Sequence, residues 1–321
     1  MSTFATPVEM PPRQRILVVR LGAMGDIIHT LPAVCGMRNK WPQAHITWLV
    51  DSKWSYLLGK VRVDRILELN RRDPASIWQV LKTLHAERAH WAIDFQGLIK
   101  SAVPARIGAP KVVGFHQDFL REKPAALFYT QKVRPHSRHI ISRNMDLSEA
   151  CGGHLSAEFP LPDGHPEGEL PEKPYVLASP LAGWASKEWP LERYAELAPM
   201  LSEVGVRLVV NGPPSAAAQL EACRPAHIHL SGLPGLIHAT RGASAVVGLD
   251  SGPLHLAACF PKGGVALFGP TDPERNGPWA GSIGVVRRPD ARTTYKRRGT
   301  VDESMRQITA REVFDALMKY L

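Results

Sequence analysis

An acidic residue, Asp26, stands near the start of the sequence at a place where chemistry can occur. It follows the apolar, mostly β-branched run 16–19 and a glycine turn at 22–25, and the apolar run that continues to about Pro32 predicts a helix. A turn between a buried parallel strand and a helix lies at the carboxyl edge of a sheet, where open α/β folds bind ligands. Asp26 therefore stands where a small molecule would arrive, although a role as a helix cap would also explain it. The turn is not G-x-G-x-x-G, which argues against a dinucleotide fingerprint.

Three motifs in the second half of the chain also follow predicted strands. Residues 250–253, Asp-Ser-Gly-Pro, open a helix, where free N–H groups and the helix dipole favour a phosphate. Lys187 follows an earlier strand and turn, and its ammonium group can reach the same phosphates. The rigid loop 269–273 follows a third strand. Each motif alone has an ordinary explanation, as a helix start, a solvated lysine or a plain turn. Their shared position at strand ends is what indicates a site. His255, one turn into its helix, can be structural or catalytic.

Several other chemistries find no support in the residue pattern. No cluster of His, Cys and carboxylates has metal-ligand spacing, and neither a P-loop nor a G-x-S-x-G elbow occurs. The four cysteines, at 35, 151, 223 and 259, form no C-x-x-C pair, which is typical of free thiols in a reducing cytoplasm. No apolar run reaches the roughly 18 residues that span a bilayer, and the N-terminus lacks the apolar core of a secretory signal. We therefore expect a cytoplasmic protein.

The positive charge of the chain is unevenly distributed. The net charge is +9 over 321 residues. Residues 1–168 hold 22 Lys and Arg against 15 Asp and Glu, a net of +7, whereas residues 169–321 hold 17 against 15, a net of +2. A basic first half suggests a phosphorylated substrate, an anionic membrane surface or nucleic acid, unless the surplus serves only solubility. The basic residues are scattered without interleaved aromatics, which makes nucleic acid the least favoured partner.

Predicted strands and helices alternate along the chain, which indicates parallel sheets covered by helices. The predicted strands are 16–19, 45–50, 65–69, 91–95, 112–115, 175–178, 206–210, 245–249 and 265–268. The stretch 159–174 is dense in Pro, Gly and Glu and has no apolar period, so it marks a domain boundary. We expect one domain over 1–165 and a second over 166–305. A C-terminal helix, 306–321, is expected to pack back on the first domain.

Several motifs of the sequence resemble those of one known family. Leu21 to Ala33, LGAMGDIIHTLPA, resembles the opening motif of glycosyltransferase family 9, the lipopolysaccharide heptosyltransferases. Further blocks resemble that family in its order, at 94–102, Arg121 with 125–129, 187–190, 250–258 and 269–273. The resemblance runs over nearly the whole chain. The residues of the opening motif resemble those of heptosyltransferase I more than those of heptosyltransferase II.

This resemblance implies a fold and a reaction. The fold is GT-B, with two Rossmann-like domains, a cleft between them and a C-terminal helix that returns to the first domain. The reaction is an inverting, metal-independent transfer of heptose from ADP-L-glycero-D-manno-heptose to Kdo of the lipopolysaccharide inner core, with lipid A-Kdo as acceptor. No cofactor is implied. The enzyme would be peripheral on the cytoplasmic face of the inner membrane, against its anionic surface.

The resemblance also assigns roles residue by residue. Asp26 would be the general base that takes the proton of the acceptor hydroxyl. Lys187 would neutralise the donor diphosphate. The other residues of the donor site would be Ser186, Asp250, Ser251, Gly252, His255 and Thr271. The acceptor site would comprise Gly25, Lys100, Arg121, His139 and Arg143.

The sequence departs from the family pattern at the nucleotide. Asn211-Gly212-Pro213-Pro214 stands where the family has an acidic residue for the donor ribose, and the next acid is Glu221. Either Glu221 or a side chain from elsewhere replaces that contact, or the nucleotide is held differently. A GT-B transferase or epimerase for another nucleotide sugar, and a non-catalytic nucleotide-binding module, therefore remain as alternatives. An NAD-dependent oxidoreductase is the weakest, since the fingerprint is missing.

Overall fold

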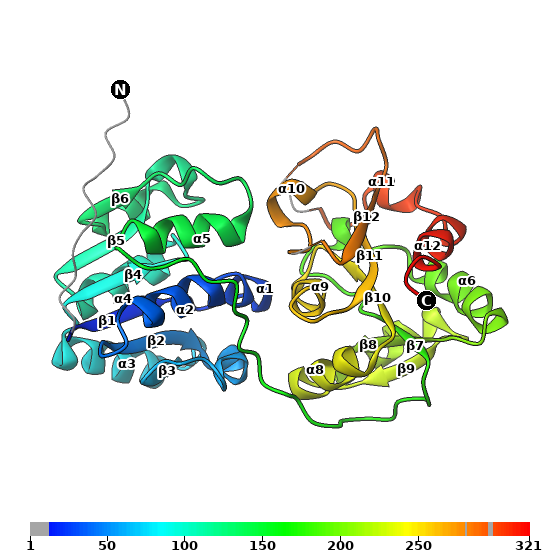
Figure 1. Cartoon of the computed structure of the whole chain (residues 1–321), viewed down its shortest axis with the longest axis horizontal. Coiled ribbons are helices and arrows are strands. Elements are labelled where there is room, and N and C mark those ends of the chain that lie inside the picture. The colour runs from blue at the N-terminus through cyan, green and yellow to red at the C-terminus, as the bar shows by residue number, and fades with distance from the viewer. Residues whose placement is uncertain (1–12, 280, 295–297) are drawn as a thin grey trace. The chain divides into compact units, whose positions relative to one another are not determined.

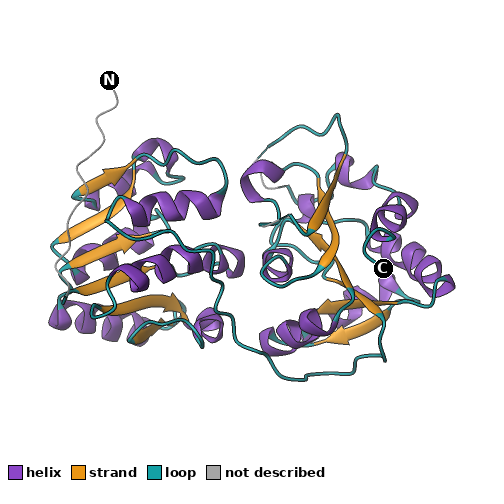
Figure 2. Cartoon of the chain, viewed as in Figure 1, coloured by secondary structure: helices purple, strands orange, loops and turns teal. Residues whose placement is uncertain are grey.

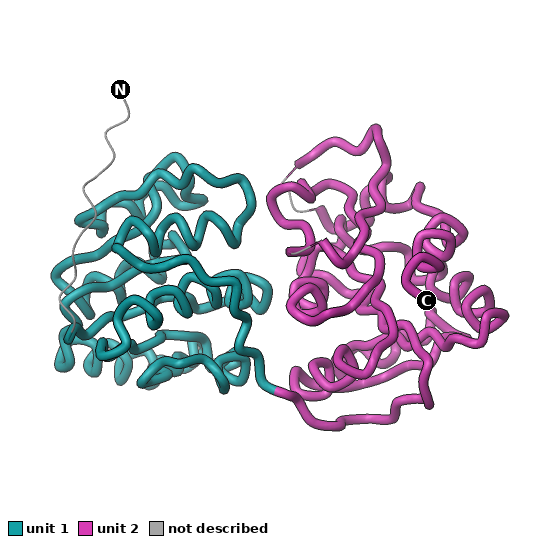
Figure 3. Tube along the Cα trace, in the orientation of Figure 1, with its two compact units in different colours: residues 1–162 teal, residues 163–321 magenta. Residues whose placement is uncertain are grey.

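The computed structural model describes residues 13–279, 281–294 and 298–321. The chain divides into two compact units, residues 1–162 and 163–321 (Figure 3). The domain boundary expected between 165 and 166 lies close to this division. Each unit is a parallel sheet covered by helices, shown in orange and purple in Figure 2.

The first unit is built on six parallel strands in the order β3-β2-β1-β4-β5-β6 (Figure 1). The strands are β1 (Arg15–Val19), β2 (His45–Asp51), β3 (Arg65–Leu69), β4 (Trp91–Asp94), β5 (Lys111–Phe115) and β6 (Gln131–Val133). The apolar runs of the inner strands β1, β2, β4 and β5 are buried on both faces, as parallel strands between helices require. All the predicted strands of this half are confirmed, whereas β6 was not predicted.

Helices cover both faces of this sheet. The α-helices are α1 (Met24–Ile28), α2 (Leu31–Lys40), α3 (Pro74–Glu87), α4 (Ile99–Gly108) and α5 (Ile140–Glu149). Three 3₁₀ segments, η1 (Ser52–Leu58), η2 (Gln117–Phe119) and η3 (Lys123–Phe128), complete the unit. The connections β1 to β2 and β3 to β4 run in opposite directions along the sheet, so right-handed crossovers place α2 and α3 on opposite faces. α5 packs on α2, α4 packs on α3, and η3 packs on α4.

The second unit repeats the same architecture, with strand order β12-β11-β10-β7-β8-β9. The strands are β7 (Tyr175–Ala178), β8 (Arg207–Gly212), β9 (His227–Leu230), β10 (Ala245–Leu249), β11 (Gly263–Phe268) and β12 (Ile283–Arg287). The α-helices are α6 (Leu191–Glu203), α7 (Ala217–Leu220), α8 (Leu233–Gly242), α9 (Gly252–Ala257), α10 (Pro273–Asn276), α11 (Glu303–Arg306) and α12 (Ala310–Leu317), and the 3₁₀ segments are η4 (Ala185–Lys187), η5 (Pro214–Ala216) and η6 (Glu221–Cys223). When the strands of each unit are numbered 1 to 6 in chain order, both sheets have the Rossmann strand order 3-2-1-4-5-6.

The C-terminal helix corrects one expectation. Residues 306–321 were expected to pack on the first domain, but α12 packs on α6 and β11 within the second unit. Val313 and Leu317 are fully buried in the same apolar core as Tyr194 and Leu197 of α6. The indole Nε1 of Trp189 also donates to the carbonyl oxygen of Ile308 (2.9 Å), which fixes the segment that leads into the helix. The apolar stripe of α12 is thus used inside the second unit.

No helix among the described residues has both the length and the apolar character needed to cross a membrane.

Candidate functional site

The carboxylate of Asp26 has two contacts within the protein and is also exposed to solvent. It is the third residue of α1, and its Oδ2 accepts the N–H of the N-cap residue Ala23 (3.1 Å). Its Oδ1 lies 2.7 Å from Nη2 of Arg20, whose side chain is 7% exposed, whereas the Asp26 side chain is 45% exposed. The capping contact that the sequence suggested is therefore present, and the carboxylate still faces solvent. Gly25 precedes Asp26 within the same short helix.

The partner of Asp26 is itself fastened to the neighbouring strand. Arg20 directly follows β1, and its Nη1 donates to the carbonyl oxygen of Phe95, which directly follows β4. The side-chain oxygen of Gln96 accepts the N–H of Leu21 (2.8 Å). β1 and β4 are paired in the sheet. These contacts connect the loop that carries the Asp26 carboxylate to the loop after β4. The position of Asp26 is therefore fixed, through Arg20, relative to two paired strands of the sheet.

A buried carboxylate, Asp94, organises the second of these loops. It accepts hydrogen bonds from the backbone N–H groups of Gln96 (2.9 Å) and Gly97 (3.2 Å) and from the hydroxyls of Ser101 (2.9 Å) and Tyr129 (2.7 Å). Burial raises the pKa of Asp94, against these four donors, which favour its ionised form. The sequence singled out the block 94–102 only by resemblance. The pairing with Tyr129 was missed, because it joins residues 35 positions apart.

Two of the predicted acceptor residues lie in one basic cluster. Lys100, near the start of α4, has its pKa lowered by partial burial and by the nearby charges of Arg71 and Arg121. Arg71 in turn contacts Oδ2 of Asp51 through Nε (2.5 Å) at the end of β2. The charges of Arg71 and Arg121 both act on Lys100, and Arg71 was not among the predicted site residues. The carboxylates of Glu122 and Asp51 act on Lys100 as well, so the cluster holds three cations against two anions. Its remaining positive charge favours an anionic ligand.

His139 and Arg143, the other predicted acceptor residues, belong to α5. His139 is the N-cap of this helix, and its Nδ1 accepts the N–H of Ile141 (3.2 Å). Its ring centroid lies 6.4 Å from that of His29, which directly follows α1. Arg143 donates from Nε to the carbonyl oxygen of Ser137 (3.0 Å). Both residues therefore have structural contacts, and His139 lies beside the helix that carries Asp26.

In the second unit, Lys187 and Asp250 form a buried ion pair. Nζ of Lys187, in η4, lies 2.6 Å from Oδ2 of Asp250 and 3.2 Å from its backbone oxygen. Nε2 of His255, in α9, lies 3.5 Å from Oδ1 of the same carboxylate. Burial opposes ionisation, but the hydrogen bond from His255 and the charge of Lys187 hold the pKa of Asp250 well below its usual range. The Lys187 ammonium also lies over the ring of Trp184, 4.4 Å from its centroid.

Three predicted donor residues carry buried hydroxyls that find no hydrogen-bond partner among the described residues. They are Ser186, Ser251 and Thr271, and each follows one of the three neighbouring strands β7, β10 and β11 at the carboxyl edge of the sheet. Gly252 follows Ser251 as the first residue of α9. A buried polar group that lacks a partner costs free energy, and a ligand with several oxygens would satisfy all three hydroxyls. The structure therefore brings Lys187 together with the other predicted residues of this half.

Asn211, which stands where the family pattern has an acidic residue for the donor ribose, is hydrogen-bonded within the second unit. The amide Nδ2 of Asn211, in β8, donates to Oγ of Ser231 (2.8 Å) and contacts Nδ1 of His229 (3.0 Å). Glu221 forms an exposed ion pair with Arg224. Asn211, at the position of the expected acid, and Glu221, the next acid, are thus both engaged with other residues of the second unit.

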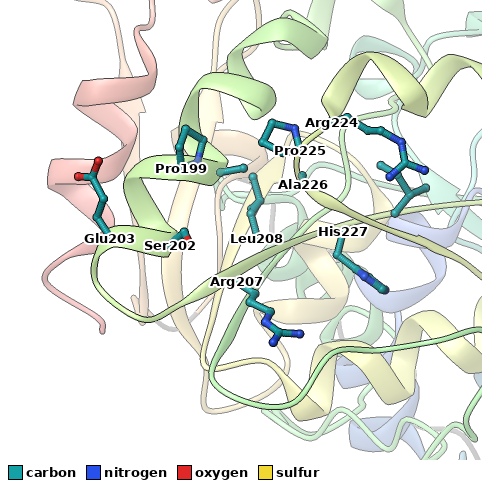
Figure 4. A pocket seen from close by; sticks show the side chains of 11 residues that line it. Pro199, Ser202, Glu203, Arg207, Leu208, Arg224, Pro225, Ala226 and His227 are labelled. Atoms are coloured by element: carbon teal, nitrogen blue, oxygen red, sulfur yellow. The ribbon is translucent and has the colours of Figure 1, made fainter.

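A wide depression of about 810 Å³ lies in another part of the second unit (Figure 4). Its walls include Arg207 and His227, where β8 and β9 begin, and Ser202 and Glu203 at the end of α6. It therefore lies at the amino edge of the sheet, opposite the edge that carries Lys187. None of its lining residues belongs to the predicted site.

Comparisons with known proteins agree with this arrangement. The family model described as glycosyltransferase family 9 (heptosyltransferase) matches residues 77–304. The chain is 29% identical over 300 residues to lipopolysaccharide heptosyltransferase 1 of Pseudomonas aeruginosa, covering 84% of this chain and 82% of that protein. It is 26% identical to the Escherichia coli K12 protein of the same name, covering 86% of this chain and 94% of that one.

Solved structures show the same fold. The E. coli heptosyltransferase WaaC with ADP-2-deoxy-2-fluoro heptose matches with a TM-score of 0.73 at 24% identity, covering 96% of this chain and 100% of that one. The E. coli ADP-heptose lps heptosyltransferase II matches with a TM-score of 0.75 at 20% identity, covering 95% and 98%. The two-domain α/β architecture expected from the sequence is confirmed.

Proposed function

Because the chain belongs to glycosyltransferase family 9, we propose that it transfers heptose from ADP-L-glycero-D-manno-heptose to Kdo of the lipopolysaccharide inner core, on a lipid A-Kdo acceptor. The heptosyltransferase relatives support the sugar and the pathway, and the solved relative with an ADP-heptose analogue supports the donor. One observation carries the mechanism: a half-exposed carboxylate, Asp26, is fixed by a buried arginine at the carboxyl edge of the first sheet.

Asp26 is the proposed general base. It takes the proton of the acceptor hydroxyl while that oxygen attacks the anomeric carbon of heptose. The bond from the anomeric carbon to the diphosphate oxygen breaks, and ADP leaves with the bonding electron pair. Attack on the face opposite the leaving group inverts the anomeric centre. Arg20 holds Oδ1 of the base, so the second carboxylate oxygen is the one that can receive the proton without breaking the ion pair.

Lys187 and the buried hydroxyls are the proposed diphosphate site. An ammonium group has three donors, and the contacts with Asp250 use two of them. The third can meet a phosphate oxygen, and Ser186, Ser251 and Thr271 supply hydroxyl donors for which the described part of the chain offers no partner. Positive charge at the leaving group stabilises the transition state as the diphosphate departs, so the proposed mechanism requires no metal ion.

The cluster of Lys100, Arg121 and Arg71 is the proposed site for the phosphates and carboxylates of the acceptor. Arg71 and Arg121 repel the Lys100 ammonium, which Glu122 and Asp51 offset only in part, and an anion that binds at Lys100 would relieve that repulsion. Since lipid A is held in a bilayer, we place the enzyme on the cytoplasmic face of the inner membrane, as a peripheral protein.

The test is ADP release by the purified protein with ADP-heptose and Kdo-terminated lipid A. We expect release to require both substrates and to fall by at least about 1,000-fold in Asp26→Asn, because the amide cannot accept the proton. ADP binding, measured by calorimetry, should stay close to that of the wild type. Asp118→Asn, which alters an exposed carboxylate of the same unit, is the matched control and should keep full turnover. Turnover retained in Asp26→Asn would refute the role of the base. No turnover with any nucleotide sugar would refute the transferase assignment.

A further inference from the structure

Exposed apolar side chains gather on one face of the first unit. Among the described residues, the two most exposed large hydrophobic side chains are Leu127 in η3 (82%) and Trp78 in α3 (71%). Ile77, beside Trp78, and Ile99, the first residue of α4, are exposed as well. Side chains of this size are normally buried, and a group of them on a surface indicates a binding face.

These side chains come from three segments that pack side by side. α4 contacts α3, and it also contacts η3. The N–H of Ile99 donates to Oε2 of Glu122 (2.8 Å), directly before η3, so the start of α4 is fastened beside the start of η3. Right-handed crossovers place all three segments on the same face of the sheet. Six of the exposed residues of these segments, the large apolar side chains and two lysines, are called the α3–η3 patch: Ile77, Trp78, Lys82, Ile99, Lys123 and Leu127.

Unpaired lysines accompany the apolar side chains of the patch. Lys82 follows Trp78 by four residues on the same face of the α-helix α3. Lys123 is the first residue of η3, the 3₁₀ segment that carries Leu127. Both lysines are exposed, and no described residue forms an ion pair with either. The cluster around Lys100, next to Ile99, adds further positive charge.

The surrounding sequence concentrates the charge of the whole protein. Residues 71–134 contain 11 Lys and Arg against 5 Asp and Glu, a net of +6. The whole chain has a net of +9. A fifth of the sequence thus holds two thirds of the net charge. Arg88, Arg106 and Lys111 of this stretch lie toward the amino edge of the sheet, so the charges that accompany Trp78 and Leu127 are Lys82, Lys123 and those around Lys100. Apolar side chains flanked by cations match the acyl boundary and the anionic headgroups of a bilayer.

We infer that the α3–η3 patch docks the first unit on a lipid bilayer with anionic headgroups. Trp78, Ile99 and Leu127 enter the boundary between headgroups and acyl chains, and Lys82 and Lys123 meet the headgroup phosphates. This inference rests on the proposed function only in that a lipid acceptor requires such contact. The docking surface itself needs neither donor nor acceptor.

The test is co-sedimentation of the purified protein with vesicles that contain no glycolipid. One preparation is phosphatidylcholine alone, and the other contains about one third phosphatidylglycerol. We expect partitioning onto the anionic vesicles to exceed that onto the neutral ones by at least tenfold, and to be largely lost in 1 M salt, where the Debye length falls to about 3 Å. Equal or absent binding to both vesicles would overturn the inference, and would leave a protein partner as the occupant of the patch.

Variants assign the binding to the patch. Trp78→Ser with Leu127→Ser should weaken binding to anionic vesicles by at least about tenfold, because both apolar side chains are removed. Lys82→Gln with Lys123→Gln should weaken it by roughly 25-fold, at about fivefold for each cation. The matched controls are Val285→Ser with Met318→Ser, exposed apolar residues of the second unit, and Lys40→Gln with Lys319→Gln. Controls that lose as much binding as the patch variants would contradict the assignment.

A second measurement separates this inference from the proposed function. With a soluble, deacylated acceptor, the patch variants should release ADP at the rate of the wild type, since none of the four substituted residues belongs to the proposed site. Vesicle binding without any turnover would leave the docking surface standing and refute the transferase. Turnover on the soluble acceptor without vesicle binding would do the reverse.

Discussion

At the scale of single residues, the candidate site depends on charged side chains that are paired before any ligand arrives. Asp26 is paired with Arg20, and Lys187 is paired with Asp250. In each pair one partner is nearly buried, Arg20 in the first and Asp250 in the second. The carboxylate of Asp26 is partly exposed to solvent, and the Lys187 ammonium has one N–H left to donate to a ligand. Such pairs fix the position of a reacting group, because truncating one partner leaves a charge or a hydrogen bond unsatisfied.

Arg20 is predicted to act as a positioning residue. In Arg20→Met the ion pair with Asp26 and the contact with the carbonyl oxygen of Phe95 are both lost. A displaced base lowers kcat by about 100-fold, whereas KM for the donor should change little. Steady-state kinetics test this, and added guanidinium ion should restore part of kcat. A wild-type kcat in Arg20→Met would contradict the role. Arg134→Met, which removes an exposed arginine, is the control.

Asp250 is predicted to make stability depend on pH. Its pKa is lowered in the folded state, so its contribution is complete above the unfolded pKa of about 3.9 and is lost as pH falls through the lower, folded pKa. Asp250→Asn also leaves the Lys187 ammonium without its partner. The variant should lose about 3 kcal/mol of unfolding free energy at pH 7. Urea unfolding should show this loss shrinking below pH 4. A loss that is the same at pH 7 and pH 3 would show that the ionised carboxylate is not the cause.

At the scale of elements, the site is set by loops at the carboxyl ends of neighbouring strands. In the first unit, contacts through Arg20 and Gln96 tie the loop after β1 to the loop after β4, and Asp94 holds the latter. The buried strands were predictable, since they are continuous apolar runs. The three strands that were missed, β6, β9 and β12, all lie at sheet edges. Edge strands are partly exposed and lack that pattern, as the sequence HIHL of β9 shows.

The placement of α12 leads to a prediction at this scale. Val313 is fully buried in the core of the second unit, so Val313→Asp should destabilise that unit by about 3 kcal/mol or more. Limited proteolysis in mild urea should cut the second unit first and leave a protected fragment that ends near Pro162. Preferential cleavage of the first unit would mean that the helix supports that unit instead. Asp315→Ala, an exposed position in the same helix, is the control.

At the scale of the whole molecule, the chain consists of two units that share one sheet topology and differ in charge. Each unit places its predicted residues at the carboxyl edge of its own sheet: a carboxylate and a basic cluster in the first, and a lysine with buried hydroxyls in the second. The basic surplus in the first half suggested three kinds of partner at the level of sequence, or solubility alone. Exposed Trp78 and Leu127, accompanied by exposed Lys82 and Lys123, favour a membrane surface.

The sequence by itself determined the fold class and the motifs that end the strands, and it predicted a domain boundary between residues 165 and 166. These depend on local patterns of apolar runs, glycine turns and Pro-rich stretches, which can be read without knowing what they contact. Only the tertiary structure decided that Arg20 pairs with Asp26, that Tyr129 meets Asp94, that Arg71 joins Lys100, and that α12 stays in the second unit. Most of these contacts join residues far apart in the chain. Their partners are selected by how the sheet folds and by which buried groups need hydrogen bonds, and neither leaves a local pattern in the sequence.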